Sequence, residues 1–303
     1  MGLIDDLKLE YKVGGITQRL IFWNVGLFVI PMILFSLVSL FGVNLSFLRW
    51  DLPGTVDWLS LSSNPSDLLW KPWSVITYAF LHGGFLHLLF NMMVLYFSGR
   101  LFLTFFTQKQ LFGLYILSTI FAGLIFVLSY NTIPLFTALG SSKMVGASAA
   151  IMAILVATAV YSPDYRVKMM LIGTVKLWHI ALVFIILDLI NVSVENQGGH
   201  VAHLSGALFG YIFIKTLQGG TDLTKSVSVV VTFFQYLFKP KNKSPFKKVH
   251  KNKKQSGGTS RRPVGKAKNY TQKQIDDILD KISQSGYDSL TKEEKDFLFR
   301  AGK

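Results

Sequence analysis

The chain has 303 residues, of which 50% are hydrophobic and only 16% are charged. This composition excludes an ordinary soluble globular domain and indicates a membrane protein. The formal net charge is +14 but unevenly placed, and the absence of cysteine excludes disulfides and cysteine-ligated metals.

Residues 1–19 form a polar lead-in, which we expect in the cytoplasm. Its acidic residues Asp5, Asp6 and Glu10 do not fit a cleavable signal peptide. An apolar segment follows at 20–41, and Pro31 in its middle predicts a kink. The connection 42–81 is long enough to be functional or packed on itself. It carries tryptophans typical of a membrane–water interface, namely Trp50, Trp58, Trp70 and Trp73.

Five further apolar segments repeat along the chain, each near the ~20 residues that cross a bilayer, although the third of these is short. Counting all six segments, basic residues lie in the connections after the second and the fourth, and also in the tail. By the positive-inside rule, this places both termini in the cytoplasm. We therefore predict an all-α membrane core at 20–217, a bundle of six helices in the cell membrane. The five segments are 85–106, 111–130, 145–161, 176–194 and 199–217.

The C-terminal part, from residue 218 onward, differs from the core. Within 218–269, the apolar stretch 227–238 is too short to cross and is predicted to lie at the interface. Residues 239–268 contain twelve Lys/Arg and no Asp/Glu, which predicts a disordered basic linker near anionic lipid. Aromatic residues are not interleaved with these charges, so we expect no nucleic-acid partner.

Residues 270–303 are predicted to form a small cytoplasmic helical hairpin whose partner is unknown. Capping-box patterns begin at Thr271 and Thr291, and Gly286 is placed to end the first helix. Apolar residues at helical spacing support both helices, at Ile275, Ile278, Leu279 and Ile282 in the first and Phe297 and Leu298 in the second.

Three polar residues of the core share one predicted depth. His87, Ser148 and His203 each lie in the first turn or two of a segment that runs inward from the outer face. Ionisable residues inside a membrane are usually functional. Small residues around Ser148, together with Gly199, Gly206 and Gly210, would let the fourth and sixth segments approach closely.

This placement predicts the parts of a serine hydrolase. Ser148 needs a base to become a nucleophile, and His203 is suited to that task near neutral pH. His87 and Asn91 are four residues apart and so share a helix face. With the Ser148 backbone N–H, they are candidate donors to an oxyanion. This chemistry requires no cofactor and no metal.

Three motifs together resemble the rhomboid family of intramembrane serine proteases, over roughly residues 17–217. They are His-x-x-x-x-His-x-x-x-Asn from His82 to Asn91, Gly-x-Ser at Gly146 to Ser148, and Ala-His-x-x-Gly-x-x-x-Gly from Ala202 to Gly210. The resemblance implies a Ser148–His203 dyad, an oxyanion hole with His87 and Asn91, and a transmembrane-helix substrate that enters sideways near the fifth segment.

The chain departs from the family pattern at three points. Trp73-Ser74 stands where the family has Trp-Arg, with Lys71 nearby. Ala149 follows the serine in place of a common glycine, and Met152 replaces an aromatic residue that often stacks on the catalytic histidine.

Other interpretations remain open. The chain could be a catalytically inactive rhomboid-like chaperone that binds membrane helices. It could also be a metal-dependent membrane protein that uses His82, His87, Asp188, His200 and His203, although no His-Glu-x-x-His motif is present. Individually, we expect His82 to be an interfacial or loop-anchoring histidine and Asp188 to make a structural hydrogen bond. His200 is equally compatible with a rim position and with a supporting donor.

Overall fold

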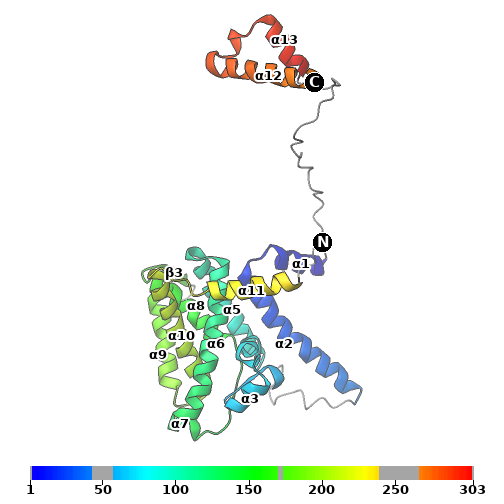
Figure 1. The fold of residues 1–303 in the computed structure, drawn as a ribbon. Helices are drawn as coiled ribbons and strands as arrows, with labels where there is room; N and C mark the ends of the chain where they lie inside the picture. The colour runs from blue at the N-terminus through cyan, green and yellow to red at the C-terminus, as the bar shows by residue number, and fades with distance from the viewer. Residues whose placement is uncertain (1, 43–56, 170–172, 239–265, 302–303) are drawn as a thin grey trace, which may run out of the picture. The chain divides into compact units, whose positions relative to one another are not determined.

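The computed structural model describes residues 2–42, 57–169, 173–238 and 266–301, and the described chain is mostly helical (Figure 1). It divides into two compact units, Met1–Pro240 and Lys241–Lys303. The predicted basic linker lies almost entirely outside the described residues.

Each of the six predicted apolar segments coincides with one helix of the first unit. Three of these helices are long and apolar enough to cross a membrane, α2, α6 and the part of α5 from Phe85 to Phe102, whereas α8 and α9 are apolar but shorter. Pro31 lies inside α2, as expected. The six helices are α2 (Ile16–Leu40), α5 (Phe85–Phe105), α6 (Gln108–Thr132), α8 (Ser148–Tyr161), α9 (Leu177–Asn191) and α10 (Gln197–Gln218).

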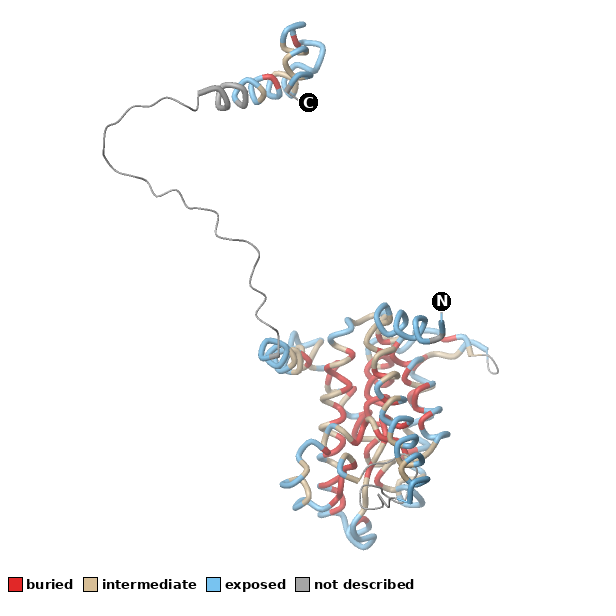
Figure 2. The backbone as a smooth tube through the Cα atoms, turned by 90° about the vertical axis from the view of Figure 1, so that its right-hand side faces the viewer, coloured by how far each residue is buried: buried red, intermediate tan, exposed pale blue. Residues whose placement is uncertain are grey.

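Helix α8 is the centre of the first unit. Every residue from 149 to 159 is buried, and the helix contacts α5, α6, α9 and α10. Figure 2 shows buried residues running along the helices of this unit. A methyl group on Gly206 or Gly210 would overlap the carbonyl oxygens of Ala149 or Ala153, so α10 touches the α8 backbone there. The predicted close approach of these two helices is therefore confirmed for both glycines.

Gly199 does not take part in that contact, and the expectation for it was wrong. A methyl group there would meet the side chain of Asn196 instead of α8. The reason is local, because Asn196 adopts a left-handed conformation with φ of 44° just before α10 and folds its side chain over Gly199.

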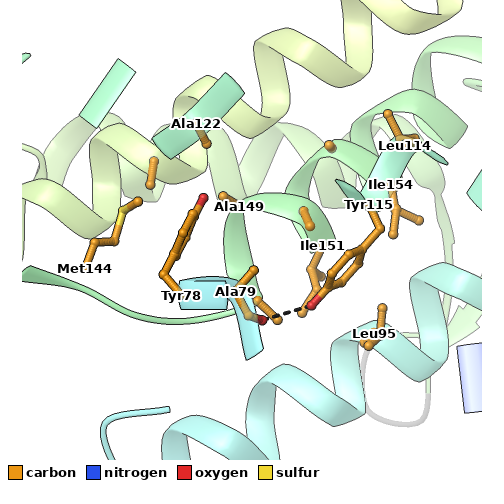
Figure 3. Packing of buried hydrophobic residues seen from close by; sticks show 14 of the residues in the cluster. Tyr78, Ala79, Leu95, Leu114, Tyr115, Ala122, Met144, Ala149, Ile151 and Ile154 are labelled. Atoms are coloured by element: carbon orange, nitrogen blue, oxygen red, sulfur yellow. Dashed lines mark hydrogen bonds between the residues drawn. The ribbon is translucent and has the colours of Figure 1, made fainter. Parts of the chain in front are cut away.

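The described part of the long first connection is packed against the helices. Its strand β1 (Leu61–Ser62) pairs antiparallel with β2 (Lys143–Met144), which directly precedes α8. The Tyr115 hydroxyl donates to the Ala79 carbonyl oxygen at 2.9 Å, and Figure 3 shows this bond beside Tyr78. The connection thus fixes the start of α8. Its other elements are η2 (Asp57–Leu59), α3 (Pro65–Trp70), α4 (Ser74–Thr77) and η3 (Tyr78–Phe80). Trp50 lies outside the described residues.

The remaining elements of the first unit are peripheral. Helix α1 (Leu3–Val13) precedes α2, and α7 (Pro134–Thr137) follows α6. In the connection between α8 and α9, β3 (Arg166–Met169) pairs antiparallel with β4 (Gly173–Lys176). The predicted interfacial stretch is α11 (Lys225–Phe238), whose Phe233 and Phe234 are exposed.

The second unit contains α12 (Lys266–Ser285), η4 (Tyr287–Ser289) and α13 (Lys292–Ala301). The predicted capping box at Thr291 is present, because Glu294 accepts from the Thr291 N–H at 2.8 Å and its own N–H donates to Thr291 Oγ1. The predicted helix start at Thr271 was wrong. Residues 266–270 lack a helix breaker, so α12 begins five residues earlier, after Gly265.

Candidate active site

A cavity of about 450 Å³ opens at the starts of α5, α8 and α10. All four predicted side chains, Ser148, His203, His87 and Asn91, line it. The prediction that they converge is therefore consistent with the structure. The rest of the wall comes from α6, from the segments just before α5 and α8, and from the start of α10. Its residues are Gly83, Phe126, Tyr130, Ser142, Lys143, Met144, Val145 and residues 196–199.

Ser148 is the first residue of α8 and is half-buried. A first-turn N–H has no acceptor within its own helix, so the Ser148 N–H is available to a ligand. The positive end of the helix dipole adds to its affinity for an anion. Among the described residues, no hydrogen bond joins Ser148 to His203. Catalytic hydrogen bonds often tighten only when substrate binds.

Gly146 fixes the chain just before this serine. Its φ is +131°, a value that residues with a side chain rarely adopt, and its N–H donates to the Tyr78 carbonyl oxygen at 2.9 Å. A methyl group on Gly146 would lie 3.1 Å from His87 Nε2 and 3.5 Å from Ser148 Oγ. The imidazole of His87 and the serine hydroxyl therefore flank the glycine closely, and a side chain here would require the imidazole to move.

The hydrogen bond to His87 identifies its protonated nitrogen. The Gly83 N–H donates to His87 Nδ1 at 3.3 Å. A neutral imidazole carries one proton, so an accepting Nδ1 leaves the proton on Nε2. That nitrogen is the one beside Gly146, and His87 can thus donate a hydrogen bond toward the serine.

Asn91 lies one turn after His87 in α5 and is buried. Its Nδ2 has no hydrogen-bond partner among the described residues. A buried donor without a partner costs about 1–3 kcal/mol. Such a donor on the wall of a cavity is suited to an oxygen that a ligand brings.

Asp188 of α9 contacts two histidines of α10. Its Oδ1 lies 2.8 Å from His203 Nδ1 and 2.7 Å from His200 Nδ1, and only 5% of the residue is exposed. The hydrogen bond expected of Asp188 is present, and His200, for which the sequence favours neither a rim position nor a supporting donor, is one of its two partners. The sequence signal for this pairing was weak, because Asp188 and His203 are 15 residues apart on different helices.

The five residues of the metal interpretation fall into two groups. Asp188, His200 and His203 present ligand atoms within 4.8 Å of one another. His82 and His87 contact each other instead, with ring centroids 5.2 Å apart. His82 is fully buried, and neither of its ring nitrogens has a partner among the described residues, so we find no hydrogen bond through which it anchors a loop.

A charged cluster holds the first connection beside the cavity. Asp57 pairs with Lys143 and, at 3.1 Å, with Lys71, while Trp73 stacks on Trp58. Burial alone would raise the pKa of Asp57, but hydrogen bonds and charges from the two lysines outweigh it and lower the pKa below its ordinary value. Lys71 thus supplies a positive charge to this loop, where Trp73-Ser74 lacks the family arginine.

Comparison with known families gives two matches. Residues 69–219 match the Rhomboid domain family. Residues 264–301 match a family of unknown function (DUF6576). No curated protein matches the chain.

Proposed function

Because this chain belongs to the rhomboid family, we propose that it is an intramembrane serine endopeptidase that cleaves transmembrane helices of membrane-protein substrates. The observation that supports this most is the cavity shared by Ser148, His203, His87 and Asn91. In this proposal α2, α5, α6, α8, α9 and α10 cross the cell membrane, and both termini are cytoplasmic.

The reaction proceeds by acyl transfer. Ser148 Oγ attacks the scissile carbonyl carbon as its proton passes to His203 Nε2, which returns that proton to the leaving amine. The carbonyl oxygen becomes an oxyanion and accepts hydrogen bonds from His87 Nε2, Asn91 Nδ2 and the Ser148 N–H. Water from the cavity, activated by His203, then hydrolyses the acyl-enzyme and regenerates the serine.

Several features of the site suit this reaction. Asn91 Nδ2, which has no hydrogen-bond partner within the described part of the chain, and the Nε2–H of His87 are donors in place before the oxyanion forms, which is the arrangement that lowers a barrier. The substrate helix reaches the cavity from the bilayer beside α9, where Leu187, Leu189 and Ile190 are exposed.

The test is cleavage of a tagged single-span membrane protein by the purified protein in detergent. Wild type should cleave it and react with a fluorophosphonate probe, whereas Ser148→Ala and His203→Ala should lose cleavage and remain folded. Near-native cleavage by either variant would refute the dyad.

The same assay separates the alternatives. Activity that persists in EDTA contradicts a metal-dependent enzyme that uses Asp188, His200 and His203. Binding of the tagged helix without cleavage or probe labelling would indicate a chaperone.

A further inference from the structure

Burying the carboxylate of Asp188 inside the helix bundle costs free energy. This carboxylate is nearly inaccessible in an apolar helix, and a buried charge is tolerated only when it is paired. Its partners are two imidazoles one turn apart on α10, and both bind the same oxygen through Nδ1.

These contacts determine how the His203 ring is protonated. An ionised carboxylate only accepts hydrogen bonds, so Nδ1 of His203 must donate. The neutral ring then has its lone pair on Nε2. A base that receives the serine proton needs that tautomer, and a ring protonated on Nε2 would not serve.

We propose that Asp188 is a positioning residue that completes a Ser148–His203–Asp188 triad; this rests on the proposed protease function. The proton moves from Ser148 Oγ to His203 Nε2 and then to the leaving amine. Throughout, Nδ1–H stays bonded to Asp188, which remains ionised and stabilises the imidazolium.

A purely structural role does not account for the hydrogen bond between His203 and Asp188. Helix α9 already packs on α8 and α10 through Leu177, Ala181 and Ala207. His200 alone gives the carboxylate a partner at 2.7 Å. The second bond, to the histidine that lines the cavity, is therefore not needed to hold α9 or to satisfy Asp188.

The test compares Asp188→Asn with His200→Ala in the cleavage assay. The amide keeps the shape of Asp188 and removes its charge, so kcat should fall by about 10²–10⁴ with KM little changed. Asp188→Glu, which restores a carboxylate, should recover part of the loss. His200→Ala retains the His203–Asp188 bond and should keep kcat within about threefold.

The controls separate this proposal from the protease function itself. Asp164→Asn removes an exposed carboxylate that pairs with Lys176 and should leave kcat unchanged. If wild type does not cleave the substrate, the proposed protease function is refuted, and the triad that rests on it is refuted as well. If wild type cleaves and Asp188→Asn matches it, or if His200→Ala loses as much kcat as Asp188→Asn, the carboxylate is only a tether between α9 and α10 and the triad is refuted.

Discussion

The substitution Gly146→Ala should damage catalysis more than it damages the fold. At φ of +131° a residue with a side chain costs about 1–3 kcal/mol of stability. The added methyl would lie 3.1 Å from His87 Nε2, so the imidazole must move by roughly a few tenths of an ångström. If that displacement removes one oxyanion donor, kcat falls by about 10²–10³.

The measurement is kcat and KM for the tagged substrate together with the melting temperature in detergent. Gly140→Ala is the matched control, because Gly140 has φ of +74° and no atom within 4 Å of the added methyl. Both variants should lose stability, by about 2–4 °C in Tm for each kcal/mol. Only Gly146→Ala should lose kcat. Wild-type kcat in Gly146→Ala, or an equal loss in both variants, would refute the role assigned to the contact with His87.

The remaining predictions use the same preparation. Asn91→Ala should lower kcat by up to about 10²–10³ with little change in KM, and an unchanged kcat would remove Asn91 from the oxyanion hole. Gly206→Leu should prevent folding of the core, because the side chain would occupy the position of the Ala149 carbonyl; a normal Tm would contradict that packing. Asp57→Asn should lower the free energy of unfolding at pH 7 by less than about 1 kcal/mol, because the ion pair is partly exposed, and should lower Tm slightly. Because the folded pKa of Asp57 is lowered, the difference from wild type should be complete above the ordinary aspartate pKa and vanish as pH falls through the folded value; a difference that persists at low pH would refute the ion-pair explanation. Deletion of residues 239–303 should leave cleavage in detergent intact, and loss of cleavage would make the C-terminal hairpin part of the enzyme.

The helical segments were predictable because hydrophobic length dominates in a membrane. Segments expected at 85–106 and 111–130 lie within three residues of α5 and α6 at each end. The convergence of His87, Ser148 and His203 on one cavity was predictable for a related reason, since polar residues are rare enough in such segments to stand out. The positions of Gly206 and Gly210 could also be interpreted correctly, because both occur at four-residue spacing and face one helix.

The errors occurred where a local contact overrides a pattern. Gly199 was assigned to helix packing, yet the left-handed Asn196 occupies the space beside it. Thr271 fits a capping box, but the preceding residues continue the helix. The Asp188 pairing depends on how α9 is rotated toward α10, and a helix whose other residues are mostly apolar carries little sequence information about rotation.

The family resemblance implies that His203 is the base and His87 an oxyanion donor, but it does not show which ring nitrogen of each histidine carries the proton. Both residues are histidines that line the same cavity, and residue type alone does not say which ring nitrogen accepts a hydrogen bond and which donates one. Their Nδ1 partners decide it: a backbone N–H from Gly83 leaves the proton of His87 on Nε2, whereas the carboxylate of Asp188 holds the proton of His203 on Nδ1. In the proposed mechanism one cavity therefore holds a hydrogen-bond donor and a base that are both histidines, and the Nδ1 partner of each ring sets its role.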